Sequence, residues 1–165
     1  MKLLILTKYP MRGPSSRYRF YQFLPALTRA GVSVTVEPFF SDAYLDMLFG
    51  GKGPSPLYLA TRSLARLTHC LAGKRFDLVW IEGELIPFLP AGMERALHAL
   101  LPRRRVYEFD DANWLRYAEK PLLRDKFLKI MKGATGAVVG NDFLAAYVKQ
   151  ACDRVLEVPD RKSVV

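Results

Sequence analysis

The chain has 165 residues, of which 50% are hydrophobic and 12% aromatic, which is enough for one globular domain and excludes a disordered chain. Its 25 Lys and Arg residues outnumber 16 Asp and Glu, and the net charge of +9 favours an anionic partner such as a phosphate ligand, acidic lipid or nucleic acid. The N-terminal apolar run is too short for a signal peptide, and no segment has the roughly 18 uncharged apolar residues that would span a membrane.

The two cysteines, Cys70 and Cys152, lie far apart and match no metal-binding or redox spacing. We expect both to be buried thiols in a reducing compartment, and the protein to be cytoplasmic. Residues 160–165 match an in-frame translation of a common sequencing-adaptor end. We therefore expect the natural sequence to be interrupted near Pro159, and the tail to be an artefact that plays no part in the fold.

The first part of the chain alternates predicted strands and helices. Lys2–Thr7 is a continuous apolar run typical of a buried strand. A turn-rich segment follows, and Ser15 or Ser16 can cap a helix from Arg17 to about Ala30, with Gly31 after its end. Pro25 predicts a kink or break in that helix. The next predicted elements are a strand over Val32–Phe39, a short helix over Ser41–Phe49 capped by Ser41 or Asp42, and a loop over Gly50–Pro56.

A longer helix is predicted over Leu57–Leu71. Its apolar residues suggest that Leu57, Ala60, Leu64 and Leu71 face the core, with Arg62, Arg66 and His69 on the other face. The remaining predicted strands are Phe76–Ile81, Val106–Phe109, Ala134–Val139 and Arg154–Val158. The remaining predicted helices are Pro87–Leu100, Pro121–Lys132 and Asn141–Ala151, the last capped by Asn141 or Asp142.

The strand–helix unit therefore repeats about five times and ends on a sixth strand. Strands that are apolar on both faces and separated by helices indicate a parallel sheet covered by helices on both sides. Right-handed crossovers make such a sheet doubly wound. We predict an α/β fold, with a doubly wound, mainly parallel Rossmann-like sheet of about six strands.

Ligands of such sheets bind at the carboxyl ends of the strands. After the first predicted strand, the loop with Arg12, Gly13, Ser16 and Arg17 combines guanidinium groups and small residues near a helix start, which suits an anion. The alternative is a capped, solvated loop. The glycine fingerprints of dinucleotide sites and P-loops are absent from this sequence.

An acid pair follows the fourth predicted strand. Asp110 and Asp111 are candidates for a base or for binding sugar hydroxyls, Asn113 is a further polar ligand, and Trp114 offers a flat apolar face to a sugar ring. The alternative is that Asp111 caps the next segment and Asp110 pairs with an arginine.

Two further strand ends carry polar groups. Glu82 and Glu84 follow the third predicted strand and Asn141 follows the fifth, and each is a candidate for binding ligand hydroxyls. The alternative for the two glutamates is a solvated loop, and helix capping alone would explain Asn141. His69 and His98 lie on predicted helix surfaces rather than at strand ends, so we expect neither a catalytic histidine nor a metal site.

Several segments resemble family 4 retaining glycosyltransferases in their order and spacing. They are Leu24–Val34, Phe76–Trp80, Tyr107–Trp114, Val138–Tyr147 and Val155–Pro159. Within Tyr107–Trp114, the acids at 110–111 stand where the family often has a histidine. Met11–Pro14 stand where it often has a Gly-Gly pair.

The resemblance implies a GT-B enzyme, whose two Rossmann-like domains enclose the active site. Residues 1–159 would be the N-terminal, acceptor-side domain of an enzyme that transfers a sugar from a nucleotide-sugar to a hydroxyl acceptor. A glycan or a lipid-linked acceptor of the cell envelope would be that acceptor. The donor-binding C-terminal domain would be absent, leaving the fragment inactive alone. Arg12, Gly13, Ser16 and Arg17 would face the donor phosphates. The nucleotide-sugar is a substrate, so the resemblance implies no cofactor and no metal.

Two other functions remain open. A stand-alone Rossmann-like nucleotide-binding module would use Glu37, at the end of the second predicted strand, as a ribose ligand. A nucleic-acid-binding domain would explain the charge, but the basic residues are spread over several helices, so we expect no nucleic acid. Residues 120–132 predict a basic amphipathic helix. It would either dock on an anionic membrane surface or form a core helix with a solvated basic face.

Overall fold

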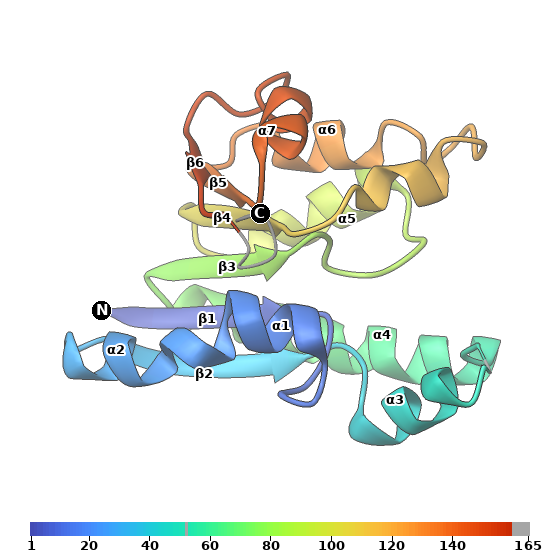
Figure 1. The fold of residues 1–165 in the computed structure, drawn as a ribbon, viewed down its shortest axis with the longest axis horizontal. Helices are drawn as coiled ribbons and strands as arrows, with labels where there is room; N and C mark the ends of the chain where they lie inside the picture. Colours follow the sequence, from blue (N-terminus) through green and yellow to red (C-terminus); the bar gives the residue numbers. More distant parts are fainter. Residues whose placement is uncertain (52, 160–165) are drawn as a thin grey trace.

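The structure, a computed structural model, describes residues 1–51 and 53–159, so the suspected artefactual tail at 160–165 lies outside the described residues. Its centre is a six-stranded, all-parallel sheet in the order β2-β1-β3-β4-β5-β6 (Figure 1). The strands are β1 (Lys2–Thr7), β2 (Ser33–Pro38), β3 (Leu78–Glu82), β4 (Arg105–Phe109), β5 (Gly136–Val139) and β6 (Val155–Glu157). The predicted Rossmann-like α/β fold class is confirmed.

Helices connect successive strands. The α-helices are α1 (Pro14–Arg19), α2 (Leu24–Arg29), α3 (Asp42–Phe49), α4 (Pro56–Leu71), α5 (Ala91–Leu97), α6 (Lys126–Met131) and α7 (Asp142–Val148). The 3-10 helices are η1 (Tyr21–Phe23), η2 (Gly73–Arg75), η3 (His98–Leu100) and η4 (Asn113–Tyr117). Of the two candidates predicted for each cap, Ser41 caps α3 and Asn141 caps α7, each by accepting the backbone N–H of the third helical residue.

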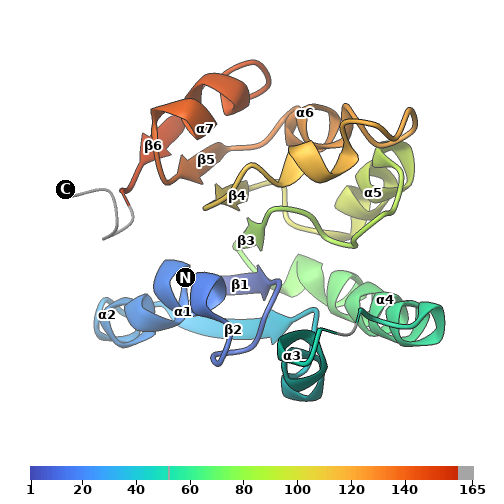
Figure 2. The ribbon, with the colours of Figure 1, turned by 45° about the vertical axis from the view of Figure 1, so that its right-hand side comes forward.

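The two faces of the sheet are covered unequally. Helices α4 to α7 lie on one face, whereas α1 and α2 lie on the other, beside β1 and β2 (Figure 2). Side chains that point toward α4 to α7, such as Ile81, Tyr107 and Val139, are fully buried. On the opposite face, Val106, Val138 and Leu156 line a shallow apolar groove of about 300 Å³. Within the described residues no helix covers this part of β4 to β6.

The register brings three strand ends together. Leu6 of β1 pairs with Ile81 of β3, and Glu82 at the end of β3 pairs with Glu108 of β4. The loops after Thr7, Glu82 and Phe109 therefore leave the sheet side by side. This arrangement positions the candidate site described below.

The first helical segment begins earlier than predicted. Helix α1 starts at Pro14, with Gly13 at its N-cap, so neither Ser15 nor Ser16 is the cap. Proline favours the first turn because its fixed φ suits a helix start and its missing N–H is not needed there. The chain breaks at η1, ahead of Pro25, which occupies the first turn of α2. Gly31 follows the helix with φ 77°, as its predicted role requires.

Helix α4 has the opposite orientation to the predicted one. Leu57, Leu64 and Leu71 are 76%, 64% and 61% exposed, whereas Arg66 and Cys70 are buried. Arg66 donates to the carbonyl oxygens of Glu37 (2.9 Å) and Thr7 (2.8 Å), at the carboxyl ends of β2 and β1. The inward face therefore donates hydrogen bonds to carbonyl oxygens at the strand ends, an interaction that hydrophobic periodicity alone does not reveal.

The prediction of a basic helix over Pro121–Lys132 is also wrong, because the helix in the structure is shorter. Residues 121–125 form turns, and α6 has only six residues. Lys126 is buried rather than solvated, and it pairs with Glu84 and Glu94.

No helix in the described part of the chain is long and apolar enough to cross a membrane. The two cysteines are buried and free, as predicted.

Candidate functional site

A polar cavity of about 220 Å³ opens at the carboxyl ends of β1, β3 and β4. Its walls combine charged groups with the aromatic rings of Tyr9, Phe39 and Phe127. The lining residues are Lys8, Tyr9, Ser15, Phe39, Glu82, Gly83, Glu84, Pro87, Asp110, Asp111, Asn113, Arg116 and Phe127. Because parallel sheets bind ligands at this edge, this cavity is the candidate site.

Glu82, the last residue of β3, fixes the loop after β1. Its buried carboxylate accepts hydrogen bonds from the Lys8 backbone N–H (2.8 Å), the Ser15 hydroxyl (3.1 Å) and the Ser16 hydroxyl (2.6 Å). Burial raises the pKa of Glu82, and the bond from Ser16 opposes this shift. Glu82 and Ser16 are both predicted ligand groups. In the structure they bind each other, and Glu82 lines the cavity.

Asp110 follows the last residue of β4 and is partly buried in the cavity wall. Burial raises the pKa of its carboxyl group, and the positive charge of Lys8 opposes the rise. Asp111 is exposed, and its carbonyl oxygen accepts the Asn113 backbone N–H at 2.8 Å, which turns the chain into η4. A partly desolvated carboxylate facing a cavity is suited to accept a proton from a ligand hydroxyl.

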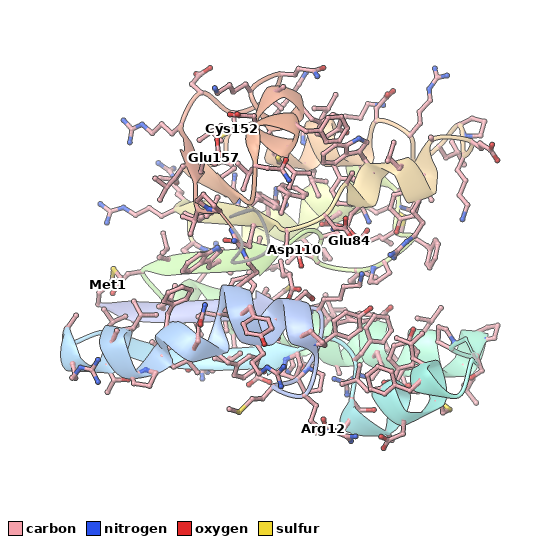
Figure 3. All side chains as sticks on the ribbon, in the orientation of Figure 1. Met1, Arg12, Glu84, Asp110, Cys152 and Glu157 are labelled. Carbon is pink, nitrogen blue, oxygen red and sulfur yellow. The ribbon has the colours of Figure 1, made fainter. Side chains whose placement is uncertain are left out.

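Glu84 links the cavity wall to a buried ion network. Its carboxylate accepts the Tyr117 hydroxyl at 2.9 Å and pairs with Lys126. The Lys126 ammonium also lies 2.9 Å from Glu94 and donates to the Ile86 carbonyl oxygen at 2.8 Å. Burial raises the pKa of Glu94 to about 6. Figure 3 shows Glu84 and Asp110 in the middle of the molecule, near the strand ends.

The two arginines of the predicted anion site lie outside the cavity lining. Arg12 is exposed and pairs with Asp46 of α3 at 2.7 Å, well away from Asp110 in Figure 3. The exposed Arg17 guanidinium lies 5.0 Å from the Tyr18 ring centroid. Gly13 permits a tight turn, because an added Cβ would lie 2.3 Å from the Tyr9 Cβ. These contacts give Arg12, Gly13 and Arg17 local structural roles.

Trp114 and Asn141 are also absent from the cavity lining. The Trp114 indole is 8% exposed, and Tyr147 of α7 stacks on it with a centroid distance of 3.7 Å and an interplanar angle of 8°. Its flat face is therefore taken up by core packing. Asn141 accepts the Leu144 backbone N–H at 3.0 Å as a helix cap.

Two cationic lining residues were missed in the sequence. Lys8 follows β1 directly, and Arg116 lies in η4. A basic residue immediately after a buried strand is a usable signal for Lys8, although the turn-rich segment around it conceals that signal. No local sequence pattern identifies Arg116 as a site residue, because only the packing of η4 turns it toward the strand ends.

Neither histidine lines the cavity. His98 was predicted on a helix surface, but its ring is half-buried and lies 3.0 Å from the Tyr107 hydroxyl. Burial lowers the pKa of His98 to about 4. His69 lies 3.4 Å from the carboxylate of Glu37, the ribose ligand of the alternative function. Among residues 1–51 and 53–159, no three His, Cys, Asp or Glu side chains form a group that could hold a metal ion.

The fold and the site define a Rossmann-like α/β domain with a polar cavity at the carboxyl edge of its parallel sheet. A scan of the chain against protein-family models found no match, and a search of curated proteins found no matching sequence.

Proposed function

We propose that this chain is the acceptor-side domain of a glycosyltransferase, which transfers a sugar from a nucleotide-sugar to a hydroxyl acceptor. The observation that carries the proposal is the partly buried carboxylate of Asp110 in a cavity at the carboxyl edge of the sheet. The resemblance of five sequence segments to family 4 enzymes supplies the reaction type. In this proposal the donor-binding domain belongs to a further part of the enzyme.

The chemistry requires the acceptor hydroxyl to lose its proton as it attacks the sugar. A hydroxyl bound to Asp110 would donate its hydrogen bond to the carboxylate, which takes the proton as the hydroxyl oxygen bonds to the anomeric carbon. The bond between that carbon and the nucleoside diphosphate breaks, and the diphosphate leaves with the bonding electron pair. Because desolvation raises the pKa of Asp110, the carboxylate is a stronger base than a solvated aspartate. Tyr9, Phe39 and Phe127 would exclude water around the acceptor ring.

The test is sugar transfer by the enzyme that includes a donor-binding domain. Asp110→Asn keeps the size of the side chain but removes the base, so kcat should fall by about 10²- to 10⁴-fold, with a smaller change in KM. Asp153→Asn is the matched control because Asp153 is exposed and does not line the cavity. An unchanged kcat in Asp110→Asn would contradict the role of Asp110. Transfer by residues 1–165 alone would contradict the need for a second domain.

A further inference from the structure

Lys8 and Arg116 line the cavity without an acidic partner. Within the described residues, neither side chain forms an ion pair or donates a side-chain hydrogen bond, although Lys8 is partly buried. The other buried cations near the sheet are engaged: Lys126 pairs with Glu84 and Glu94, and Arg19 pairs with Glu108. Lys8 and Arg116 are therefore the cations left available to a ligand in this cavity.

The acids of the cavity differ in how far they are already neutralised. Glu84 pairs with Lys126, and Glu82 accepts three hydrogen bonds from the loop after β1. Asp110 and Asp111 form no side-chain ion pair in the described part of the chain. The cavity therefore presents two free cations beside two free carboxylates, an arrangement that suits a ligand with both an anionic group and hydroxyls.

The two cations also repel each other. Burial is the main reason that the pKa of Lys8 is lowered, and the positive charge of Arg116 is the next. Glu82, Asp110 and Glu84 act in the opposite direction but do not cancel the shift. An anion bound by both cations would relieve the repulsion and accept charge-assisted hydrogen bonds from both side chains.

We propose that Lys8 and Arg116 bind an anionic oxygen group, a phosphate or a carboxylate, on the same small ligand whose hydroxyl meets Asp110. Arg116 offers a planar, bidentate fork and Lys8 a compact point charge, a pairing suited to either group. The cavity, at about 220 Å³, is smaller than the ~300 Å³ at which sites for drug-sized ligands begin, so it fits a single ring with its anionic substituent. The identity of this ligand as a sugar acceptor rests on the proposed function.

Binding of three sugars to the 165-residue chain tests the proposal by calorimetry or by amide chemical shifts at low salt. Glucose is neutral, glucose 1-phosphate carries a phosphate and glucuronate carries a carboxylate. We expect at least one of the two anionic sugars to bind at least tenfold more tightly than glucose, with the advantage shrinking as salt is added. The stronger of the two identifies the anionic group. Equal affinity for all three sugars would overturn the proposal.

Substitutions at Lys8 and Arg116 test whether the preference for an anionic sugar arises in the cavity. Arg116→Gln and Lys8→Gln should each lower the affinity for the anionic sugar about tenfold while leaving the affinity for glucose unchanged. Arg124→Gln is the matched control, because its side chain is 65% exposed and outside the cavity lining. An equal loss in Arg124→Gln would indicate attraction to the overall charge and would overturn the site. If Lys8→Gln does not fold, Arg116→Gln decides, because Arg116 is exposed and its replacement leaves the core intact.

The outcomes separate this inference from the proposed function. Glucose binding that Asp110→Asn weakens, without any preference for the anionic sugars, would overturn the anion site and leave the acceptor role of the cavity standing. A preference for an anionic sugar that Arg116→Gln abolishes supports the anion site, even where the two-domain enzyme transfers no sugar.

Discussion

Carboxylates at neighbouring strand ends differ in chemistry because their partners differ. Glu82 accepts three hydrogen bonds and holds the loop after β1, whereas Asp110 faces the cavity with its pKa raised by burial. The same comparison separates the arginines, because Arg12 pairs with Asp46 whereas Arg116 lines the cavity. The role of each charged side chain therefore depends on the residue with which it forms a hydrogen bond or an ion pair.

The burial of His98 should make the stability of the protein depend on pH. The folded-state pKa of His98 is about 4, below its ordinary value of 6.5, so the folded protein keeps the ring neutral. The resulting stability is fully present above pH 6.5 and is lost as the pH falls toward 4. Allowing for partial exposure of the ring, we expect about 1 kcal/mol less stability at pH 5 than at pH 7 from this group.

Urea unfolding of the unsubstituted chain and of His98→Gln at the two pH values measures this contribution. Buried carboxylates such as Glu94 titrate in both proteins, so the difference between the two pH dependences isolates His98. Identical pH dependences would show that His98 is not held neutral by the fold.

Helix α4 turns a charged side chain, rather than its leucines, toward the sheet. Its inward Arg66 bonds two strand-end carbonyl oxygens, and burial lowers the pKa of Arg66 to about 10. The leucine stripe faces outward instead. Apolar periodicity correctly predicted the existence of the helix but gave the wrong face, because the deciding interaction is with β1 and β2.

Alanine substitutions test this orientation. Arg66→Ala removes the hydrogen bonds to two strand-end carbonyl oxygens and leaves the place of a buried side chain empty, so it should lower the free energy of unfolding by about 3 kcal/mol. Leu64→Ala removes an exposed side chain from a helix and should change it by less than about 0.5 kcal/mol. Denaturant unfolding of the two variants provides the measurement. A larger loss for Leu64→Ala would mean that the helix packs with the leucines inward.

For the whole molecule, the main consequence of the topology is unequal coverage of the sheet. The crossovers after β2, β3, β4 and β5 all place their helices on one face (Figure 2). Val139 on that face is fully buried, whereas the adjacent Val138 lies on the grooved face and is partly exposed. One strand thus carries two valines of the same size in different environments.

The same substitution at both valines tests this asymmetry. Val139→Thr buries a hydroxyl among apolar side chains and should lower the free energy of unfolding by about 2 kcal/mol. Val138→Thr keeps access to water and should cost less than about 0.5 kcal/mol. Thermal or urea unfolding of the two variants is the measurement. Equal losses would show that the grooved face is as fully covered as the other.

Local sequence patterns are sufficient to predict the order of strands and helices, the parallel α/β class and the edge of the sheet where polar groups collect. These follow from local patterns: apolar runs make buried strands, Ser41 and Asn141 make caps, and strand ends carry Glu82 and Asp110. Local patterns do not determine where loop side chains point. That depends on partners distant in sequence, such as Asp46 for Arg12 and Tyr147 for Trp114. Only the tertiary structure, by packing η4 against the strand ends, placed Arg116 with Lys8 in the cavity.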